Sequence, residues 1–149
     1  MMKKLLLALP MLLVIAAGCS PVEETKNTIT YVNEATEYAN EAATFAEELP
    51  AMAQDAVTNP ETAEQLESTL KDFQAQIDEF NQVEVPQLME DLNGQISEQN
   101  GKIQAGVEDA ITAIEEGSFQ PDILQNSELL NSLQDIQGIY ENIQKLGNE

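Results

Sequence analysis

The groups that could do chemistry in this chain are one cysteine, Cys19, and 27 carboxylates. Histidine is absent, so the side chain that most often serves as general base or metal ligand is missing. A thiolate is a strong nucleophile, and carboxylates suit acid–base catalysis or calcium binding. Each of these uses requires particular neighbours, so the surrounding sequence decides what each group can do.

Cys19 follows a leader typical of exported proteins. Two lysines, Lys3 and Lys4, precede an apolar run of 13 residues, 5–17, which ends in small side chains. Thirteen helical residues span roughly 20 Å, less than the ~30 Å hydrocarbon core of a bilayer. We therefore expect residues 1–18 to be a cleaved signal peptide and not a permanent membrane span.

The order Ala16-Ala17-Gly18-Cys19 resembles the lipobox of bacterial lipoproteins, although that class most often has leucine where Ala16 stands. The resemblance implies that the Cys19 thiol receives a diacylglyceryl group and that cleavage leaves Cys19 as an N-terminally acylated first residue. Two or more acyl chains, such as palmitate, hold a protein stably on a membrane. A free thiol after plain secretion and an uncleaved anchor are the alternatives. An internal disulfide is excluded because there is no second cysteine.

The mature chain would be small and strongly acidic. Removal of the first 18 residues leaves 131, enough for one domain. It also leaves four lysines against 27 carboxylates, a net charge of −23. Such a surface repels phosphate, which argues against nucleic-acid binding and against electrostatic adhesion to anionic lipid. The protein would therefore reach the membrane through the lipid on Cys19, on the extracytoplasmic face of a bacterial cell, in a Gram-positive species by the resemblance described below.

The carboxylates form no recognisable catalytic or metal site. Adjacent pairs of carboxylates occur, and an acid–base pair needs two carboxyl groups in different environments, whereas we expect these on solvated helix faces. The sequence has no Asp-x-Asp-x-Asp-Gly loop, nucleophile elbow or phosphate-binding glycine loop. It thus predicts a protein that is not an enzyme, with no catalytic residue, specific metal site or cofactor, and weak association of divalent cations is a minor alternative. The pairs considered are Glu23-Glu24, Glu47-Glu48, Glu90-Asp91, Glu108-Asp109 and Glu115-Glu116.

Apolar side chains at helical spacing predict an all-α domain over residues 29–146, after a lipidated N-terminus and polar tether at 19–28. No run with the alternation of a strand competes. The expected helices are at about 29–56, 60–83, 86–116 and 127–146. Their apolar stripes are Tyr31, Ala35, Tyr38, Ala42, Phe45, Leu49, Met52 and Ala56; Ala63, Leu66, Leu70, Phe73, Ile77 and Phe80; Leu88, Leu92, Ile96, Ile103, Val107, Ala110, Ile111 and Ile114; and Leu129, Leu130, Leu133, Ile136, Tyr140, Ile143 and Leu146.

Prolines and capping residues indicate where these helices end. Asn59-Pro60 is typical of a helix start, and Ser127 is a candidate cap for the last helix. Pro50 predicts a kink or break, with the helix resuming for about one turn, and Pro86 disfavours helix in the residue before it. The domain is therefore predicted to be an antiparallel four-helix bundle or, if 60–116 is one helix kinked at Pro86, a three-helix bundle.

The third helix contains residues that do not fit an apolar stripe. Gln99 and Asn100 lie where apolar side chains are expected, and three glycines each weaken the helix by about 1 kcal/mol. The glycines favour close approach of a neighbouring helix, and a ligand groove beside them is the alternative. They are Gly94, Gly101 and Gly106.

The stretch Thr30-Tyr31-Val32-Asn33-Glu34-Ala35-Thr36-Glu37-Tyr38 resembles a segment of small lipoproteins from Bacillus-type Gram-positive bacteria, above all in its part Tyr31-Val32-Asn33-Glu34-Ala35-Thr36. That family has the same layout of signal, lipidated cysteine and helical body. It has no established function, so the resemblance implies location and fold only. Tyr31 and Tyr38 lie one heptad apart, and we expect them in the core rather than in a recognition patch.

Two functions from different classes fit this sequence. The first is a non-catalytic interaction or structural module, in which a lipid-anchored bundle binds a protein partner or associates with itself at the membrane. The second is a lipoprotein that binds a small ligand or a divalent cation, with a groove near Gly94 to Gly106 as its site. The first fits better, because the chain has an anchor and no catalytic equipment.

Overall fold

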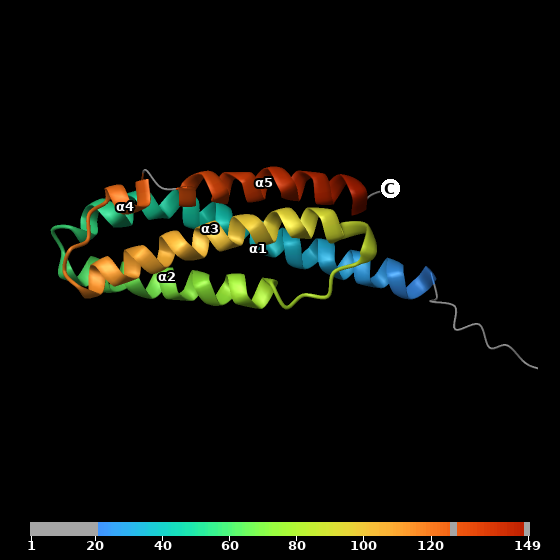
Figure 1. The fold of residues 1–149 in the computed structure, drawn as a ribbon, viewed down its shortest axis with the longest axis horizontal. Helices are drawn as coiled ribbons and strands as arrows, with labels where there is room; N and C mark the ends of the chain where they lie inside the picture. The colour runs from blue at the N-terminus through green and yellow to red at the C-terminus, as the bar shows by residue number, and fades with distance from the viewer. Residues whose placement is uncertain (1–20, 126–127, 148–149) are drawn as a thin grey trace, which may run out of the picture.

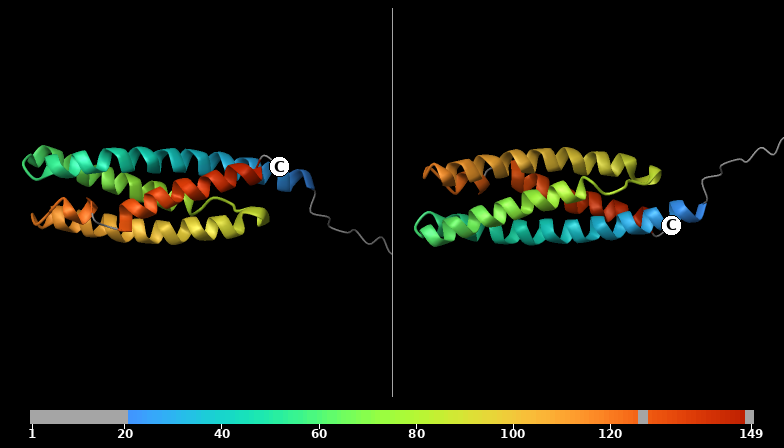
Figure 2. Two further views of the ribbon diagram at one scale, coloured as in Figure 1. Left: turned by 90° about the horizontal axis from the view of Figure 1, so that it is seen from above. Right: turned by 90° about the horizontal axis from the view of Figure 1, so that it is seen from below.

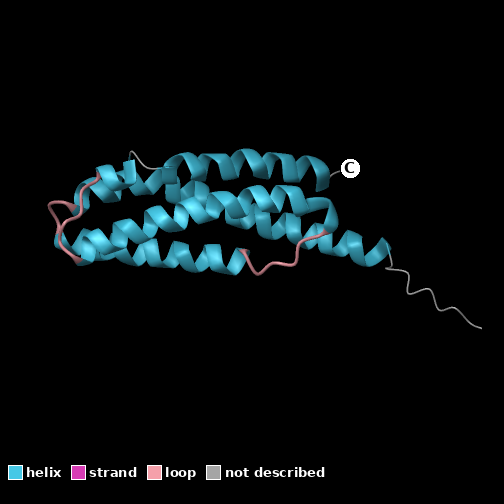
Figure 3. Ribbon diagram, viewed as in Figure 1, coloured by secondary structure: helices cyan, strands magenta, loops and turns pink. Residues whose placement is uncertain are grey.

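The computed structural model describes residues 21–125 and 128–147, with side chains from residue 25 onwards. Cys19, the leader and Ser127 therefore lie outside the described residues. Within these ranges the chain is helical and contains no strand (Figure 3). A single 3₁₀ turn, η1, precedes the third long helix. The elements are α1 (Pro21–Ala56), α2 (Pro60–Phe80), η1 (Gln87–Met89), α3 (Glu90–Glu115), α4 (Asp122–Gln125) and α5 (Glu128–Gly147).

The four long helices lie along one axis and alternate in direction (Figures 1 and 2). Helix α1 packs against α2 and α5, and α3 packs against the same two helices, so that α1 and α3 occupy diagonal corners. The predicted antiparallel bundle is confirmed in its four-helix form. The three-helix alternative is wrong, because the backbone leaves the helix after Phe80 and stays non-helical to Pro86. Val83 and Val85 pack against the core there, which holds the connection in place.

Two helix ends show why the chain turns where it does. The Asn59 side chain accepts hydrogen bonds from the amides of Glu61 and Thr62, at 3.0 and 3.4 Å, and Pro60 is the first helical residue, as predicted. Helix α3 ends at Glu115, and the chain turns away at Gly117, whose φ of 68° suits glycine. The next amide, that of Ser118, donates to the carbonyl of Ala113 at 2.9 Å, so one of the last carbonyl groups of the helix has a hydrogen-bond partner.

Helix α1 differs from its prediction at its start and at Pro50. It begins at Pro21, so the predicted tether at 19–28 is helical from that residue on. Proline suits the first helical position and acids suit the first turn, and residues 21–24 supply both. Of the kink or break predicted at Pro50, the break does not occur, because α1 runs through the proline to Ala56, where the helix was predicted to end. Leu49 is buried just before the proline and Ala53 just after it, so packing on both sides holds the helix together.

The core consists largely of the predicted stripes, with a change of register from Met52 to Ala53 and another at the start of α3. Leu88 is 58% exposed, whereas its neighbour Met89 is fully buried. The prediction placed this turn inside an α-helix, but η1 has the tighter 3₁₀ geometry and turns Met89 inward instead. Among the described residues, no helix combines the length and the apolar character needed to cross a bilayer.

Candidate functional site

An aromatic ladder fills the space between α1 and α2. Tyr31, Tyr38 and Phe45 follow one another at heptad spacing on α1, and Phe73 and Phe80 do so on α2. The Phe45 and Phe73 rings stack with their centroids 4.1 Å apart, and those of Tyr38 and Phe80 with 4.5 Å between them. Tyr31 meets Phe80 at 6.0 Å in a tilted arrangement. The predicted core position of both tyrosines is confirmed, since neither is more than 3% exposed.

The hydroxyl groups of both tyrosines reach across the bundle to the diagonal helix α3. Tyr31 Oη donates to Asn93 Oδ1 at 3.0 Å, and Tyr38 Oη donates to Asn100 Oδ1. The Asn100 amide in turn donates to Asn81 Oδ1 at 3.1 Å. Asn100 is only 1% exposed, so this chain satisfies a buried amide that would otherwise destabilise the fold.

Burial raises the pKa of both tyrosine hydroxyls, so both stay neutral at pH values where an exposed tyrosine ionises. It raises the pKa of Tyr31 to about 12. The pKa of Tyr38 rises as well, through burial and through the nearby carboxylate of Glu41, against the lowering effect of its hydrogen bond to Asn100. Phenols with raised pKa values are poor bases and poor nucleophiles at neutral pH, so both act as hydrogen-bond donors in the core.

The outer side of the ladder opens into a long groove. One hollow of about 390 Å³ has Phe45 and Phe73 in its lining, and a second of about 230 Å³ has Tyr38 and Phe80. The two share Glu41 and Gln76, and together we call them the α1–α2 groove. Its lining consists of Glu34, Glu37, Tyr38, Asn40, Glu41, Thr44, Phe45, Glu48, Thr69, Asp72, Phe73, Gln76, Glu79, Phe80 and Val83.

The groove is acidic and has no lysine in its lining. Glu41 lies near its middle, and the pKa of that carboxyl is raised by burial first and then by the carboxylates of Glu37 and Glu79. The three groups are thus close enough to repel one another. They do not form a metal site, since no group of described Asp, Glu, Cys or His side chains has that arrangement.

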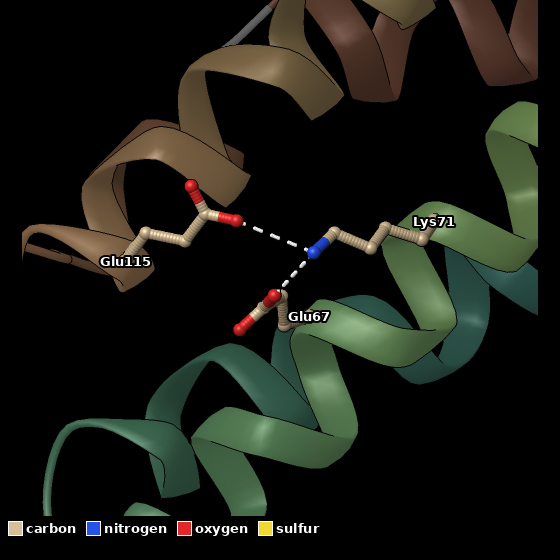
Figure 4. Close-up of polar contacts among 3 residues, drawn as sticks. All are labelled: Glu67, Lys71 and Glu115. Atoms are coloured by element: carbon tan, nitrogen blue, oxygen red, sulfur yellow. Dashed lines mark hydrogen bonds and ion pairs between the residues drawn. The ribbon is translucent and has the colours of Figure 1, made fainter.

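Lys71 lies beside the groove on α2 but is directed away from it. Figure 4 shows its ammonium group between the carboxylates of Glu67, on the same helix, and Glu115, on α3. The Nζ atom is 3.2 Å from Glu115 Oε1. Hydrogen bonds to Glu67 and Glu115 raise the pKa of Lys71. The positive charge therefore joins α2 to α3 and leaves the adjacent Asp72 in the groove without this neighbour as a counterion.

The other sites considered from the sequence are less suited to binding or catalysis. The described carboxylate pairs, from Glu47-Glu48 to Glu115-Glu116, are exposed as predicted, although Glu48 also lines the α1–α2 groove, and the side chains of Glu23-Glu24 lie outside the described residues. A hollow of about 460 Å³ does lie beside Gly101 and Gly106. The close approach of another helix was predicted for all three glycines of α3, but it occurs only at Gly106.

At Gly106 a Cβ atom would lie 3.1 Å from the side chain of Leu129 on α5, whereas at Gly94 and Gly101 it would meet nothing within 4 Å. Gly106 thus allows α3 and α5 to pack closely. At Gly94 and Gly101 no close contact requires the absence of a side chain.

Comparisons with known proteins identify the family. The sequence model of a family of unknown function (DUF6376) matches residues 31–146. The chain belongs to this family. A relative from Bacillus subtilis (strain 168), "Uncharacterized lipoprotein YybP", is 32% identical over 132 residues, which cover 89% of each chain. No solved structure matches the chain. The predicted resemblance to Bacillus-type lipoproteins is thereby confirmed.

The family match includes the whole groove and both tyrosine–asparagine pairs. The sequence interpretation treated Asn100 as an interruption and did not notice Asn93. A signal was present, however: the two asparagines are one heptad apart, as are Tyr31 and Tyr38, and both pairs are separated by 62 positions. Equal spacing on two helices of the same direction indicates a repeated contact.

Proposed function

We propose that this protein is anchored to the extracytoplasmic face of the cell membrane through lipid on Cys19. The observation that carries the proposal is the Ala16-Ala17-Gly18-Cys19 motif after an export leader, in a chain that aligns with a lipoprotein over nearly its whole length. The start of α1 at Pro21 supports it further. A helix that begins two residues after the anchor would hold the bundle close to the membrane surface.

We further propose that the anchored bundle is a non-catalytic interaction module rather than an enzyme. Its described carboxylate pairs are solvated, and its buried tyrosines are engaged in hydrogen bonds to asparagines. These arrangements support binding and structural roles. The partner is expected to be another protein at the membrane or a second copy of the chain, and the α1–α2 groove is one acidic surface available to it.

Lipid attachment is tested by replacing the thiol. Cys19→Ala should abolish incorporation of a labelled fatty acid and leave a precursor that retains its leader, as mass spectrometry of the N-terminal peptide would show. Ser20→Ala, which keeps the thiol, is the matched control and should be labelled and processed like the parent. Label on the Cys19→Ala protein, or a parent chain without lipid, would contradict the proposed anchor.

The interaction role is tested by crosslinking in living cells, followed by solubilisation of the membranes in several mild detergents. A single adduct of constant mass, either a dimer of this chain or one other protein, is the expected result. If no adduct recurs across detergents and growth phases, the protein does not act through a stable partner.

A further inference from the structure

We propose that the bundle lies on its side on the bilayer, with one charge-poor surface of α1 and α5 against the lipid headgroups. The inference rests on the proposed lipid on Cys19 and goes beyond it, because an anchor alone does not determine which side of the protein meets the membrane. We call this surface the α1–α5 face. Its residues are Ile29, Val32, Thr36 and Ala43 on α1 and Gln137, Tyr140 and Gln144 on α5.

The chain leaves little distance between the anchor and the bundle. Cys19 precedes Pro21, the first residue of α1, by two positions. Two residues reach at most about 7 Å, so a lipid on Cys19 would hold the first turn of α1 at the level of the headgroups. A long tether would let every face of the bundle meet the bilayer equally, whereas an anchor this short favours the sides of α1 itself.

The acids of α1 leave one side of that helix uncharged. Between residues 26 and 47 the helix has three acids, and all of them line the α1–α2 groove; they are Glu34, Glu37 and Glu41. The face residues of α1 lie on the side turned from that groove, since Ile29 is followed by the others at three, seven and fourteen positions. From Ile29 to Ala43 this uncharged side is roughly 21 Å long.

Helix α5 continues this surface. Its C-terminal end lies beside the first turns of α1, where a Cβ atom on Gly147 would be 2.8 Å from a methyl group of Val32 (Figure 2). Residues 135, 138 and 142 line a hollow towards α3, so residues 137, 140 and 144 lie on the side of α1. Glu141 is the acid nearest to this side, and Lys145 follows it by one turn, the order in which opposite charges attract on a helix.

The side chains of the face suit the boundary between headgroups and acyl chains. Among the side chains that the structure describes, three large apolar ones are exposed, and Ile29, at 55%, is the one that lies on a long helix. Val32 and Tyr140 are partly exposed, and tyrosine favours such boundaries because its ring is apolar and its hydroxyl polar. A carboxylate there would lose hydration and meet anionic lipid, so the charge-poor face approaches the bilayer most easily.

Single tryptophans test this orientation, since the chain has none of its own. Ile29→Trp and Gln137→Trp place the fluorophore on the α1–α5 face, and Ser97→Trp places it at an exposed position on the opposite side. Gln104, one heptad after Ser97 on α3, donates to Asp78 on α2 at 2.9 Å, which identifies that side. Each full-length lipidated chain is reconstituted into vesicles of phosphatidylglycerol and phosphatidylcholine, with bromine on the acyl chains of the phosphatidylcholine as the quencher.

The positions of these tryptophans separate a bundle on its side from one that stands on its anchored end. The asparagines of α3 that meet the two buried tyrosines of α1 are 62 positions later in the chain, so Ser97 lies at the level of residue 35. Gln137 is ten residues before Gly147, the neighbour of Val32, and thus lies roughly 10 Å farther from the anchored end than Ser97.

A bundle on its side should give about threefold stronger quenching at Ile29→Trp and Gln137→Trp than at Ser97→Trp, because an apolar face on a bilayer is buried roughly 5–10 Å into the boundary. Stronger or equal quenching at Ser97→Trp compared with Gln137→Trp would mean that the bundle stands upright or has no fixed orientation. Blue-shifted emission of both face tryptophans without quenching would mean that a second copy covers the face. Either result would overturn the inference.

The mass of the N-terminal peptide separates failure of this inference from failure of the anchor. A lipidated chain in which no tryptophan is quenched would overturn the orientation and leave the anchor standing. A peptide without lipid would contradict the anchor, and with it the orientation. Thermal unfolding followed by circular dichroism establishes that each variant is folded, so an absence of quenching cannot come from a loss of structure.

Discussion

The two halves of the bundle are built from different side chains. Between α1 and α2 the buried residues include five aromatic rings, four of them stacked, and α1 places small alanines among them. On α3 and α5 the buried residues are mostly branched aliphatics, and Gly106 lies close against Leu129. Rings are rigid and stack in few ways, whereas aliphatic side chains fill space in many. The aromatic half therefore fixes the register of two helices and also contributes to the lining of the groove.

The halves differ in polarity too. Both tyrosine–asparagine hydrogen bonds start from α1 and end on α3, so they tie the aromatic half to the aliphatic one across the bundle. Such bonds add little net stability but strongly disfavour arrangements in which a buried polar group loses its partner. We infer that the filling of volume by aliphatic side chains stabilises the half formed by α3 and α5. Ring geometry and hydrogen bonds determine the arrangement of the half formed by α1 and α2.

The largest effect should come from breaking the ladder in its middle. Phe73→Ala removes a ring that stacks on Phe45 and also faces Tyr38, and we expect a loss of about 3–5 kcal/mol in the free energy of unfolding. Leu133→Ala is the counterpart in the aliphatic half, where neighbours can relax into the space. Urea denaturation followed by circular dichroism should show the smaller loss for Leu133→Ala. Equal losses would mean that the rings have no special role.

The next effect should separate the two tyrosine hydroxyls. Tyr38→Phe leaves the buried Oδ1 of Asn100 without its donor, so we expect a loss of about 1–3 kcal/mol. Tyr31→Phe should lose only about 0.5–1 kcal/mol, because water can reach the half-buried Asn93. Combining Tyr38→Phe with Asn100→Leu should recover part of the loss by removing both polar groups. Identical losses for the two tyrosine variants in the same denaturation assay would contradict this ranking.

Alkaline pH should weaken the aromatic half selectively. An unfolded tyrosine ionises near pH 10, whereas the pKa of Tyr31 in the fold is about 12. The contribution of its neutral form to stability is therefore complete below pH 10 and is lost as the pH rises from 10 to 12. Tyr38 shifts in the same direction. At about pH 11 we expect the raised pKa of Tyr31 alone to have lowered the free energy of unfolding by about 1 kcal/mol relative to neutral pH. The double variant Tyr31→Phe/Tyr38→Phe should show a flatter dependence of unfolding free energy on pH, and an unchanged slope would refute the assignment.

The sequence predicts the helices of this fold well because their buried faces repeat along the chain. Leu66, Leu70 and Ile77 were placed in the core from spacing alone, and Asn59 was placed at a helix start from its side chain. The proline and the acids of residues 21–24 also fit a helix start, although the sequence predicts a polar tether there. The first stripe residue, Tyr31, comes ten positions later, so burial gives no indication of the start of α1.

Other features depend on contacts that no single segment reveals. Helix α1 continues through Pro50 because its neighbours on both sides are buried by other helices. The groove exists because α1 and α2 are offset so that their rings interleave, and that offset is a property of the pair. Of the acidic residues in the lining, only Glu48 belongs to a pair that the sequence predicts on a polar helix face, and the sequence does not reveal which acids face one another across a hollow.

The smallest effect should distinguish two glycines of α3 and so sharpen the contrast between the halves. Gly101→Ala adds a methyl group to open space on an exposed helix, and we expect a gain of about 0.5–1 kcal/mol. Gly106→Ala would place its Cβ 3.1 Å from the Cβ and Cδ1 atoms of Leu129, so the gain in helix propensity is offset by overpacking, with a net loss of up to about 1 kcal/mol. The Cβ of Leu129 is fixed to its backbone, so α5 as a whole would have to move. If both variants were equally stabilised in thermal and urea unfolding, the aliphatic half would be more compliant than its close contact implies, and the tight packing at Gly106 would not limit its stability.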